Sequence, residues 1–138
     1  MKKLQDWDVR YRKFVQKNKN KPFVWGDWDC CRFVDGLVKE ITGEHLIPET
    51  LDWTDEVTAN KTIKDYGKTL YGAIKKATKA KGIKPIDKVY MTKGDIVVYK
   101  QKTKLVGICD GFSILSPTDD GINVASNDLA IKVWRIDG

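Results

Sequence analysis

Cys30 is the residue whose type and position in this sequence best fit a chemical role. An apolar series at helical spacing runs through Cys30, Phe33, Val34, Leu37, Val38 and Ile41. Cys30 therefore falls in the first turn of a predicted helix, where unpaired backbone N–H groups stabilise a thiolate and lower the pKa below the free value of about 8.5. Cysteine hydrolases can activate a nucleophile in this way. A small buried cysteine that fills space under a sheet explains the same periodicity, so both interpretations stay open at this point.

Other polar groups near Cys30 are less suited to activate it. Asp27 and Asp29 precede the helix, but carboxylates beside a thiol raise its pKa, so we expect them to cap the helix. His45, the single histidine, follows the far end of the helix, roughly 20 Å from the thiol by helical rise. We therefore expect an exposed loop histidine. Cys31 lies opposite the apolar stripe and is predicted to be a partly covered structural thiol.

The cysteines indicate neither a disulfide framework nor a metal centre. Cys30, Cys31 and Cys109 are odd in number and two of them are adjacent, and a bridge between neighbours needs a strained geometry. A reducing compartment fits this pattern best. The sequence has no Cys-x-x-Cys pair, and its one histidine stands apart from the cysteines, so we expect no metal and no other cofactor.

Helical periodicity dominates the first 80 residues. An apolar stripe predicts a first helix from about residue 4 to residues 18–20. The Cys30 helix has a capping aspartate before it and Gly43 as its stop signal. Residues 44–58 show no steady period and are predicted to be irregular. Residues 59–80 regain helical spacing, with two internal glycines that leave open one helix or two short ones.

The rest of the chain has the composition of β-strands. Short β-rich runs occupy residues 95–99, 105–110, 112–115, 122–126 and 131–136. Turn signals between them lie at Asp110-Gly111, Ser116–Gly121 and Ser126–Asp128. Helices followed by a meander predict an α+β fold with a mostly antiparallel sheet. We expect one domain over residues 1–138, with a helical part over about 1–82 and a sheet part over about 90–138.

Composition and charge exclude several classes of protein. With 138 residues, 41% hydrophobic and 32% charged, the chain is typical of a globular domain rather than a disordered or fibrous one. No apolar run approaches the roughly 20 residues of a membrane span, and residues 1–6 lack the apolar segment of a signal peptide. The net charge of +6 is segregated: residues 1–22 carry +6 and 60–104 carry +10, whereas 23–59 carry −7 and 105–138 carry −3. The lysines lack interleaved aromatics, so we expect solvated helix faces rather than nucleic-acid binding.

Three motifs resemble the NlpC-type cell-wall peptidases, which have a papain-like fold. The segment Phe23-Val24-Trp25-Gly26-Asp27-Trp28-Asp29-Cys30 resembles the start of their nucleophile helix. Gly94-Asp95 and the apolar run after it resemble the next strand, and Leu105-Val106-Gly107-Ile108 resembles the following His-Val-Gly-Ile strand. The Phe-x-Trp-Gly-x-x-Asp-Cys-Cys start and the Trp134-Arg135 ending also resemble a small uncharacterised family found among phage and prophage tail genes. The resemblance implies Cys30 as the nucleophile.

The departures from that family pattern bear on activity. The histidine that serves as the general base in the peptidases corresponds to Leu105, which cannot take a proton. The polar residue that orients the base is often a second histidine on the next strand, and the matching stretch here, Ile114-Leu115-Ser116, has no imidazole. General acid–base catalysis contributes roughly 10²- to 10⁴-fold, so its loss predicts a vestigial nucleophile. The resemblance also suggests Trp28 and Trp53 as rim residues of a substrate groove, with core packing as the alternative, and Trp25 as a core residue.

Three functions follow from these observations. The first is a noncatalytic NlpC-like structural or adaptor protein of a bacteriophage tail or related particle, made in the host cytoplasm and located in the virion. Its partners would be other tail or virion proteins in an oligomeric assembly. The second is a cysteine peptidase or amidase that acts on peptidoglycan through Cys30. The third is a module that binds peptidoglycan or polyanions. A membrane partner is not expected under any of the three.

Overall fold

The computed structural model describes residues 1–138 and confirms the predicted α+β architecture. The helices are α1 (Trp7–Asn18), α2 (Cys30–Thr42), α3 (Glu56–Gly67) and α4 (Leu70–Ala80). The strands are β1 (Lys84–Ile86), β2 (Ile96–Lys100), β3 (Lys104–Cys109), β4 (Ser113–Thr118), β5 (Gly121–Ser126) and β6 (Ala130–Arg135), with short 3-10 turns η1 (Lys88–Tyr90) and η2 (Asn127–Leu129). The region 59–80 thus forms two helices, which separate at Lys68, where φ is +69°.

Helix α2 has the boundaries that its periodicity and caps predict. The Asp29 carboxylate accepts a hydrogen bond from the Arg32 backbone N–H at 2.9 Å and so caps the first turn. Gly43 ends the helix in the left-handed conformation, and its N–H donates to the Lys39 carbonyl. The apolar face between these caps is buried completely, with Phe33 and Leu37 at 0% exposure. Cys30 is the first residue of the helix, as predicted.

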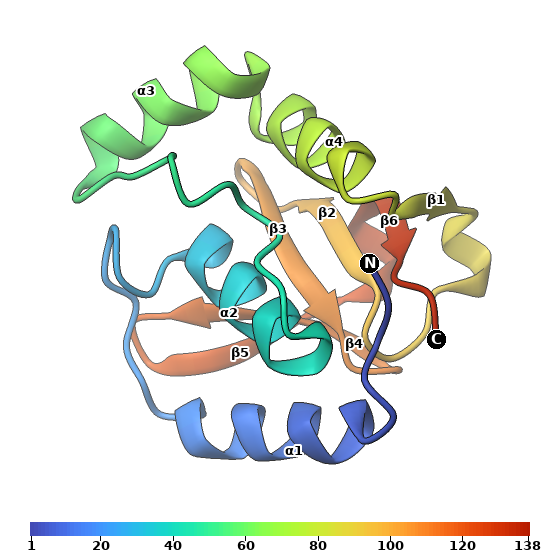
Figure 1. Cartoon of the computed structure of the whole chain (residues 1–138). Helices are drawn as coiled ribbons and strands as arrows, with labels where there is room; N and C mark the ends of the chain where they lie inside the picture. Colours follow the sequence, from blue (N-terminus) through green and yellow to red (C-terminus); the bar gives the residue numbers. More distant parts are fainter.

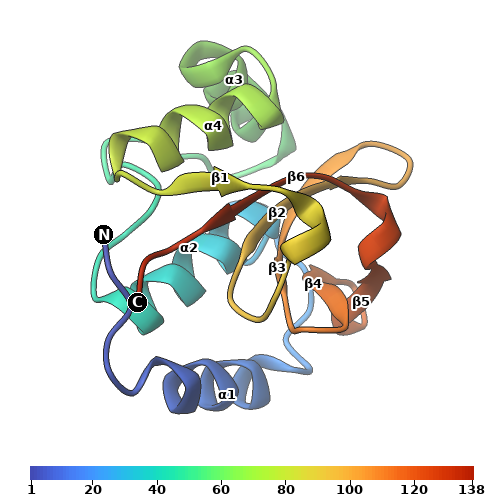
Figure 2. The ribbon, with the colours of Figure 1, turned by 90° about the vertical axis from the view of Figure 1, so that its right-hand side faces the viewer.

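The sheet has the strand order β1-β6-β2-β3-β4-β5, and every neighbouring pair is antiparallel. Strands β2 to β5 form a meander, and β6 returns to pair with the free edge of β2. Strand β1, which the sequence analysis did not predict, adds to β6 beyond this edge (Figure 2). It is three residues long and contains Pro85, so it has little strand signal, and only pairing with β6 holds it extended.

A second correction concerns Pro117, which was predicted to lie in a turn that starts at Ser116. Strand β4 instead continues through Pro117, which faces Ile122 of β5, and ends at Thr118. On its other side β4 pairs with β3 only through Leu115 and Ile114. The missing N–H of proline therefore interrupts no hydrogen bond to β3 at this position.

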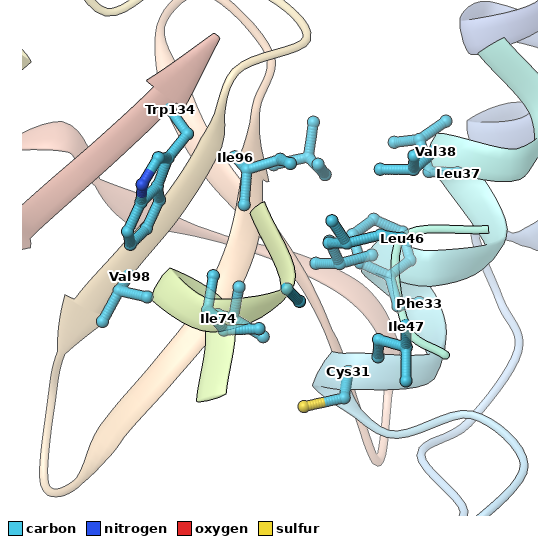
Figure 3. Packing of buried hydrophobic residues seen from close by; sticks show 14 of the residues in the cluster. Cys31, Phe33, Leu37, Val38, Leu46, Ile47, Ile74, Ile96, Val98 and Trp134 are labelled. Atoms are coloured by element: carbon cyan, nitrogen blue, oxygen red, sulfur yellow. The ribbon is translucent and has the colours of Figure 1, made fainter. Parts of the chain in front are cut away.

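Helix α2 packs against one face of the sheet, and other helices lie on two sides of it. Helix α1 runs along one side of α2, and α3 and α4 lie on the opposite side (Figure 1). The main core joins α2 to the sheet and to α4, through residues such as Phe33, Ile74 and Trp134 (Figure 3). A smaller core that includes Tyr99 and Val133 covers the other face of the sheet. None of the helices is long and apolar enough to span a membrane.

A buried ion pair joins the Gly94-Asp95 motif to the Trp134-Arg135 ending. Asp95 is fully buried, and its two carboxylate oxygens accept hydrogen bonds from Nε and one terminal nitrogen of Arg135 at 3.0 and 2.9 Å. The Thr92 N–H also donates to Asp95, and Arg135 reaches the Tyr90 carbonyl. The Gly94-Asp95 motif and the Trp134-Arg135 ending thus meet in one ion pair. This contact lies far from Cys30 in sequence and fastens β6 to the start of β2.

Candidate functional site

Cys30 lines a groove of about 420 Å³, here called the thiol groove. One wall is the segment before α2, with Phe23 and Trp25, and another is α3 together with Trp53. The start of β3 closes the third side with Leu105. The half-buried Cys30 thiol therefore faces an open space between helices and sheet, rather than a closed core.

Asp29 holds the groove walls together. Its side chain is 2% exposed and accepts three hydrogen bonds, from the Arg32 N–H, the Gly26 N–H and the indole N–H of Trp53 at 2.6 Å. These donors belong to α2, to the turn before it, and to the segment that leads into α3. The prediction that Asp29 caps the helix is confirmed, and the structure adds that the same carboxylate fixes Trp53 in the groove.

Gly26 and Arg32 complete this frame. Gly26 has φ +83°, and a Cβ at this position would lie 2.7 Å from the Thr54 Cα and the Trp53 carbonyl oxygen, so only glycine fits. The Arg32 guanidinium donates to the Gly26 carbonyl and to Asp52, and stacks 3.7 Å from the centroid of the Trp53 ring. Most residues of the motif around Cys30 thus build the groove wall, and the Cys30 side chain lines the groove.

The electrostatic surroundings favour a thiolate at Cys30. The hydrogen bond from the Cys31 thiol is the main cause that lowers the Cys30 pKa, and the backbone N–H groups of Val106 and Cys31 act in the same direction. Burial and the Asp29 carboxylate oppose them. The Cys31 pKa moves well above its usual range, because its proton is held by Cys30 and its sulfur is buried. Cys30 is therefore the nucleophilic member of this pair.

Cys31 is covered more fully than the sequence predicts. It was predicted to lie opposite the apolar stripe as a partly covered structural thiol; it is 9% exposed and contacts the main core at the N-terminal end of α2 (Figure 3). The residues that cover it include Ile47 and Ile74, from the segment after α2 and from α4. Helical periodicity of α2 by itself does not reveal this cover, because it is supplied by elements that fold over the second face.

On the face of the sheet away from α2, two side-chain hydroxyls form a pair. Tyr99 of β2 and Ser116 of β4 form a hydrogen bond of 2.6 Å between their oxygens. Gly107 of the intervening β3 makes room for it, because a Cβ there would lie 3.3 Å from the Tyr99 ring and 2.5 Å from the Leu115 carbonyl oxygen. Tyr99 was not predicted as a partner of Ser116, because their contact depends on the register of three strands.

No histidine lines the groove, and apart from the cysteines its titratable side chains are Asp29, Glu56 and Lys104. Burial is the main cause that raises the pKa of Tyr99, and the nearby Cys30 charge adds to it, so the phenol stays protonated at neutral pH. Asp29 already accepts three hydrogen bonds. His45 does not line the groove: its Nδ1 lies 2.8 Å from Asp35 and its Nε2 lies 3.3 Å from Glu49. No cluster of three or more His, Cys, Asp and Glu side chains is placed to hold a metal ion.

The tryptophans exchange their predicted places. Trp28, suggested as a rim residue, is 5% exposed and packs against Phe14 and Phe33 in the core. Trp25, predicted to be in the core, is 39% exposed and lines the groove with its edge against Phe23. Trp53 lines the groove as suggested, although it is mostly buried. The tight turn at Gly26 decides which of the two flanking indoles points inward.

The fold and the site define a small α+β domain with a thiol at a helix N-terminus, in a groove that no histidine lines. Over residues 2–136 the chain matches the family described as Domain of unknown function (DUF6950), and it belongs to this family. A search of curated proteins found no match. The family match spans the thiol groove and the Asp95–Arg135 pair alike.

The hydrogen bond from Cys31 leads to a first prediction about the thiol. Removing this donor with Cys31→Ala raises the Cys30 pKa, so the thiolate forms at higher pH. We expect iodoacetamide to alkylate Cys30 about 3- to 10-fold more slowly at pH 6, since each pKa unit changes the thiolate fraction tenfold below the pKa. Peptide mass spectrometry over pH 5 to 9 measures the rate. Cys31→Ser, which keeps an O–H donor, is the matched control, and identical profiles for both variants would contradict the prediction.

Proposed function

We propose that this protein is a noncatalytic domain of the papain-like, NlpC-type fold that serves as a structural or adaptor component of a bacteriophage tail or related particle. The observation that supports it most is the thiol groove. Cys30 stands at the start of α2 as a nucleophile would, but by the resemblance Leu105 occupies the position of the base, and the stretch 114–116 that matches the orienting residue has no imidazole. The frame of the site is thus present without its proton-transfer groups.

Peptide hydrolysis by a thiol needs a group that protonates the leaving amine. A histidine beside the thiol fulfils this role in cysteine hydrolases, and its contribution is roughly 10²- to 10⁴-fold. No histidine lines the thiol groove, and Tyr99, whose pKa is raised, is hydrogen-bonded to Ser116 on the other face of the sheet. A lowered pKa of Cys30 makes attack feasible, but no imidazole lines the groove to carry the proton to the leaving amine, which favours a noncatalytic role.

The assignment to a tail rests on the motifs that resemble the small family of phage and prophage proteins. These motifs have structural duties in this chain: Gly26, Asp29 and Arg32 build the groove wall, and Asp95 and Arg135 fasten β6 to the start of β2. The chain thus has the motif residues that maintain the shape of the domain, but it lacks the histidines that transfer protons in the peptidases. Segregated charge also suits contacts between unlike faces in an assembly.

Detection in purified particles tests this proposal directly. An epitope-tagged copy replaces the gene in the phage or prophage that encodes the chain, and particles are purified by density gradient and digested for quantitative mass spectrometry. We expect the chain in a fixed ratio to the major tail protein, and partner proteins cross-linked to it. Particles that lack the chain, with the tagged protein confined to the lysate, would contradict the proposal.

A peptidase or amidase acting on peptidoglycan is the second candidate, and the lowered pKa of Cys30 is the observation that favours it. Wild-type protein and Cys30→Ser are incubated with purified muropeptides, and new amino groups are counted. Release of amines by the wild type that Cys30→Ser abolishes would establish the peptidase and reject the noncatalytic domain. The proposal predicts the same background for both proteins.

Restoring an imidazole at the position of Leu105 should change the thiol measurably. A protonated histidine beside Cys30 lowers the thiol pKa, so for Leu105→His we expect alkylation of Cys30 at pH 6 to be at least about tenfold faster than in wild type. Leu105→Gln is the matched control, because it is polar and of similar size but carries no charge. Equal rates for the two variants would mean that residue 105 does not face the thiol, and the assignment of the vacant base position would fail.

A further inference from the structure

A second groove, distinct from the thiol groove, lies between α4 and the strands β1 and β6. Its volume is about 390 Å³, and four lysines line it: Lys75, Lys79, Lys84 and Lys132. We call it the lysine groove. Lys75 and Lys79 are one helical turn apart on α4, Lys84 comes from β1, and Lys132 lies on β6. Figure 2 shows how α4 runs alongside β1 and β6 at this edge.

The charges of these lysines are not neutralised within the protein. The lysines that form ion pairs with carboxylates are Lys21, Lys61 and Lys93, and none of them belongs to the lysine groove. No acidic residue lines the groove. Four lysines from three elements thus line one groove, although each alone looks like an ordinary solvated residue in the sequence. Such a concentration of positive charge attracts anions and favours a ligand that carries several negative groups.

The aromatic residues of the groove do not offer a free ring face. Trp134 is 2% exposed, and the Tyr71 ring packs edge-on against it with a centroid separation of 6.1 Å. The Lys104 ammonium lies 5.8 Å from the centroid of the Tyr71 ring. A nucleobase would therefore find no open surface on which to stack. The groove presents ammonium groups as point charges, which bind phosphate oxygens without a requirement for base or sugar.

We propose that the lysine groove binds the phosphates of a linear phosphodiester polymer and recognises charge rather than bases. The convergence of Lys75, Lys79 and Lys132 on one groove is the observation that carries this inference. It does not depend on Cys30 or on the role proposed for the thiol groove. Nucleic acid and poly(glycerol phosphate) share this chemistry, and both are used as probes below.

Fluorescence anisotropy with a fluorescein-labelled 20-mer of deoxythymidine measures the binding. In the triple variant Lys75→Gln, Lys79→Gln, Lys132→Gln we expect the affinity at 50 mM salt to fall at least about tenfold. The slope of log K against log salt should also fall by about 2, because three phosphate contacts are lost on a single strand. Unlabelled poly(glycerol phosphate) should displace the oligonucleotide from the wild type, with an affinity per phosphate within about threefold.

A second triple variant, on α1 and at the residue that follows it, provides the matched control. Lys13→Gln, Lys17→Gln, Lys19→Gln removes the same total charge from exposed lysines that lie outside the groove and pair with no carboxylate. We expect it to change the affinity less than about twofold at 50 mM salt, while circular dichroism shows both triples to be folded. Equal losses in the two triples, or no binding by the wild type, would overturn the proposal. Failure of poly(glycerol phosphate) to compete would overturn recognition by phosphates alone.

Discussion

Arg135→Ala is expected to lower the free energy of unfolding by about 3 kcal/mol, the value typical of a buried charge that loses its partner. The Asp95 carboxylate is fully buried, and it accepts two hydrogen bonds from the charged guanidinium of Arg135. After the substitution only the Thr92 N–H remains to it. Urea unfolding followed by circular dichroism measures the change.

A matched arginine tests whether the loss comes from the buried partner. Arg12 forms an exposed contact of 3.4 Å with Asp8 on α1, and its replacement by alanine should cost less than about 1 kcal/mol. Arg135→Lys keeps the charge but not the two-pronged geometry, so we expect an intermediate loss. If Arg135→Ala is no more destabilising than Arg12→Ala, water satisfies Asp95 and the contact does not fasten β6.

Asp29→Ala is expected to destabilise the protein by a similar amount, about 3 kcal/mol, and to deform the thiol groove. The substitution removes the cap of α2, which is worth about 1 kcal/mol. It also leaves the Gly26 N–H and the buried Trp53 indole N–H without their acceptor, and an unpaired buried donor costs about 1–3 kcal/mol. Because Trp53 lines the groove, the alkylation rate of Cys30 should change together with the stability.

Asp55 is the natural comparison for Asp29. It caps α3 through Thr58, but it is exposed and holds no buried donor, so Asp55→Ala should be clearly less destabilising than Asp29→Ala and leave Cys30 alkylation unchanged. Asp29→Asn keeps one carbonyl oxygen for the helix cap while it removes the second acceptor, and we expect an intermediate stability. Equal stabilities of Asp29→Ala and Asp55→Ala would show that the hydrogen bonds to Gly26 and Trp53 add nothing to the cap.

The sequence by itself determined the local structure around Cys30. Helical periodicity and the capping residues placed α2 between Asp29 and Gly43, with the thiol in its first turn, and both boundaries agree with the structure. The β-rich runs and the turn signals also located β2 to β6, although β4 continues into the segment predicted as a turn after Leu115. These features follow from interactions between residues close in sequence, and such interactions leave periodic patterns that can be recognised in a single chain.

Only the tertiary structure decided what surrounds the thiol. Cys31 is buried by segments that follow α2, Trp25 and Trp28 exchange places around the Gly26 turn, and Tyr99 meets Ser116 across three strands. The Asp95–Arg135 pair and the lysine groove likewise join residues that lie far apart in the chain. The physical reason is that each of these contacts depends on strand register and on how helices cover the sheet, and no short-range pattern encodes either.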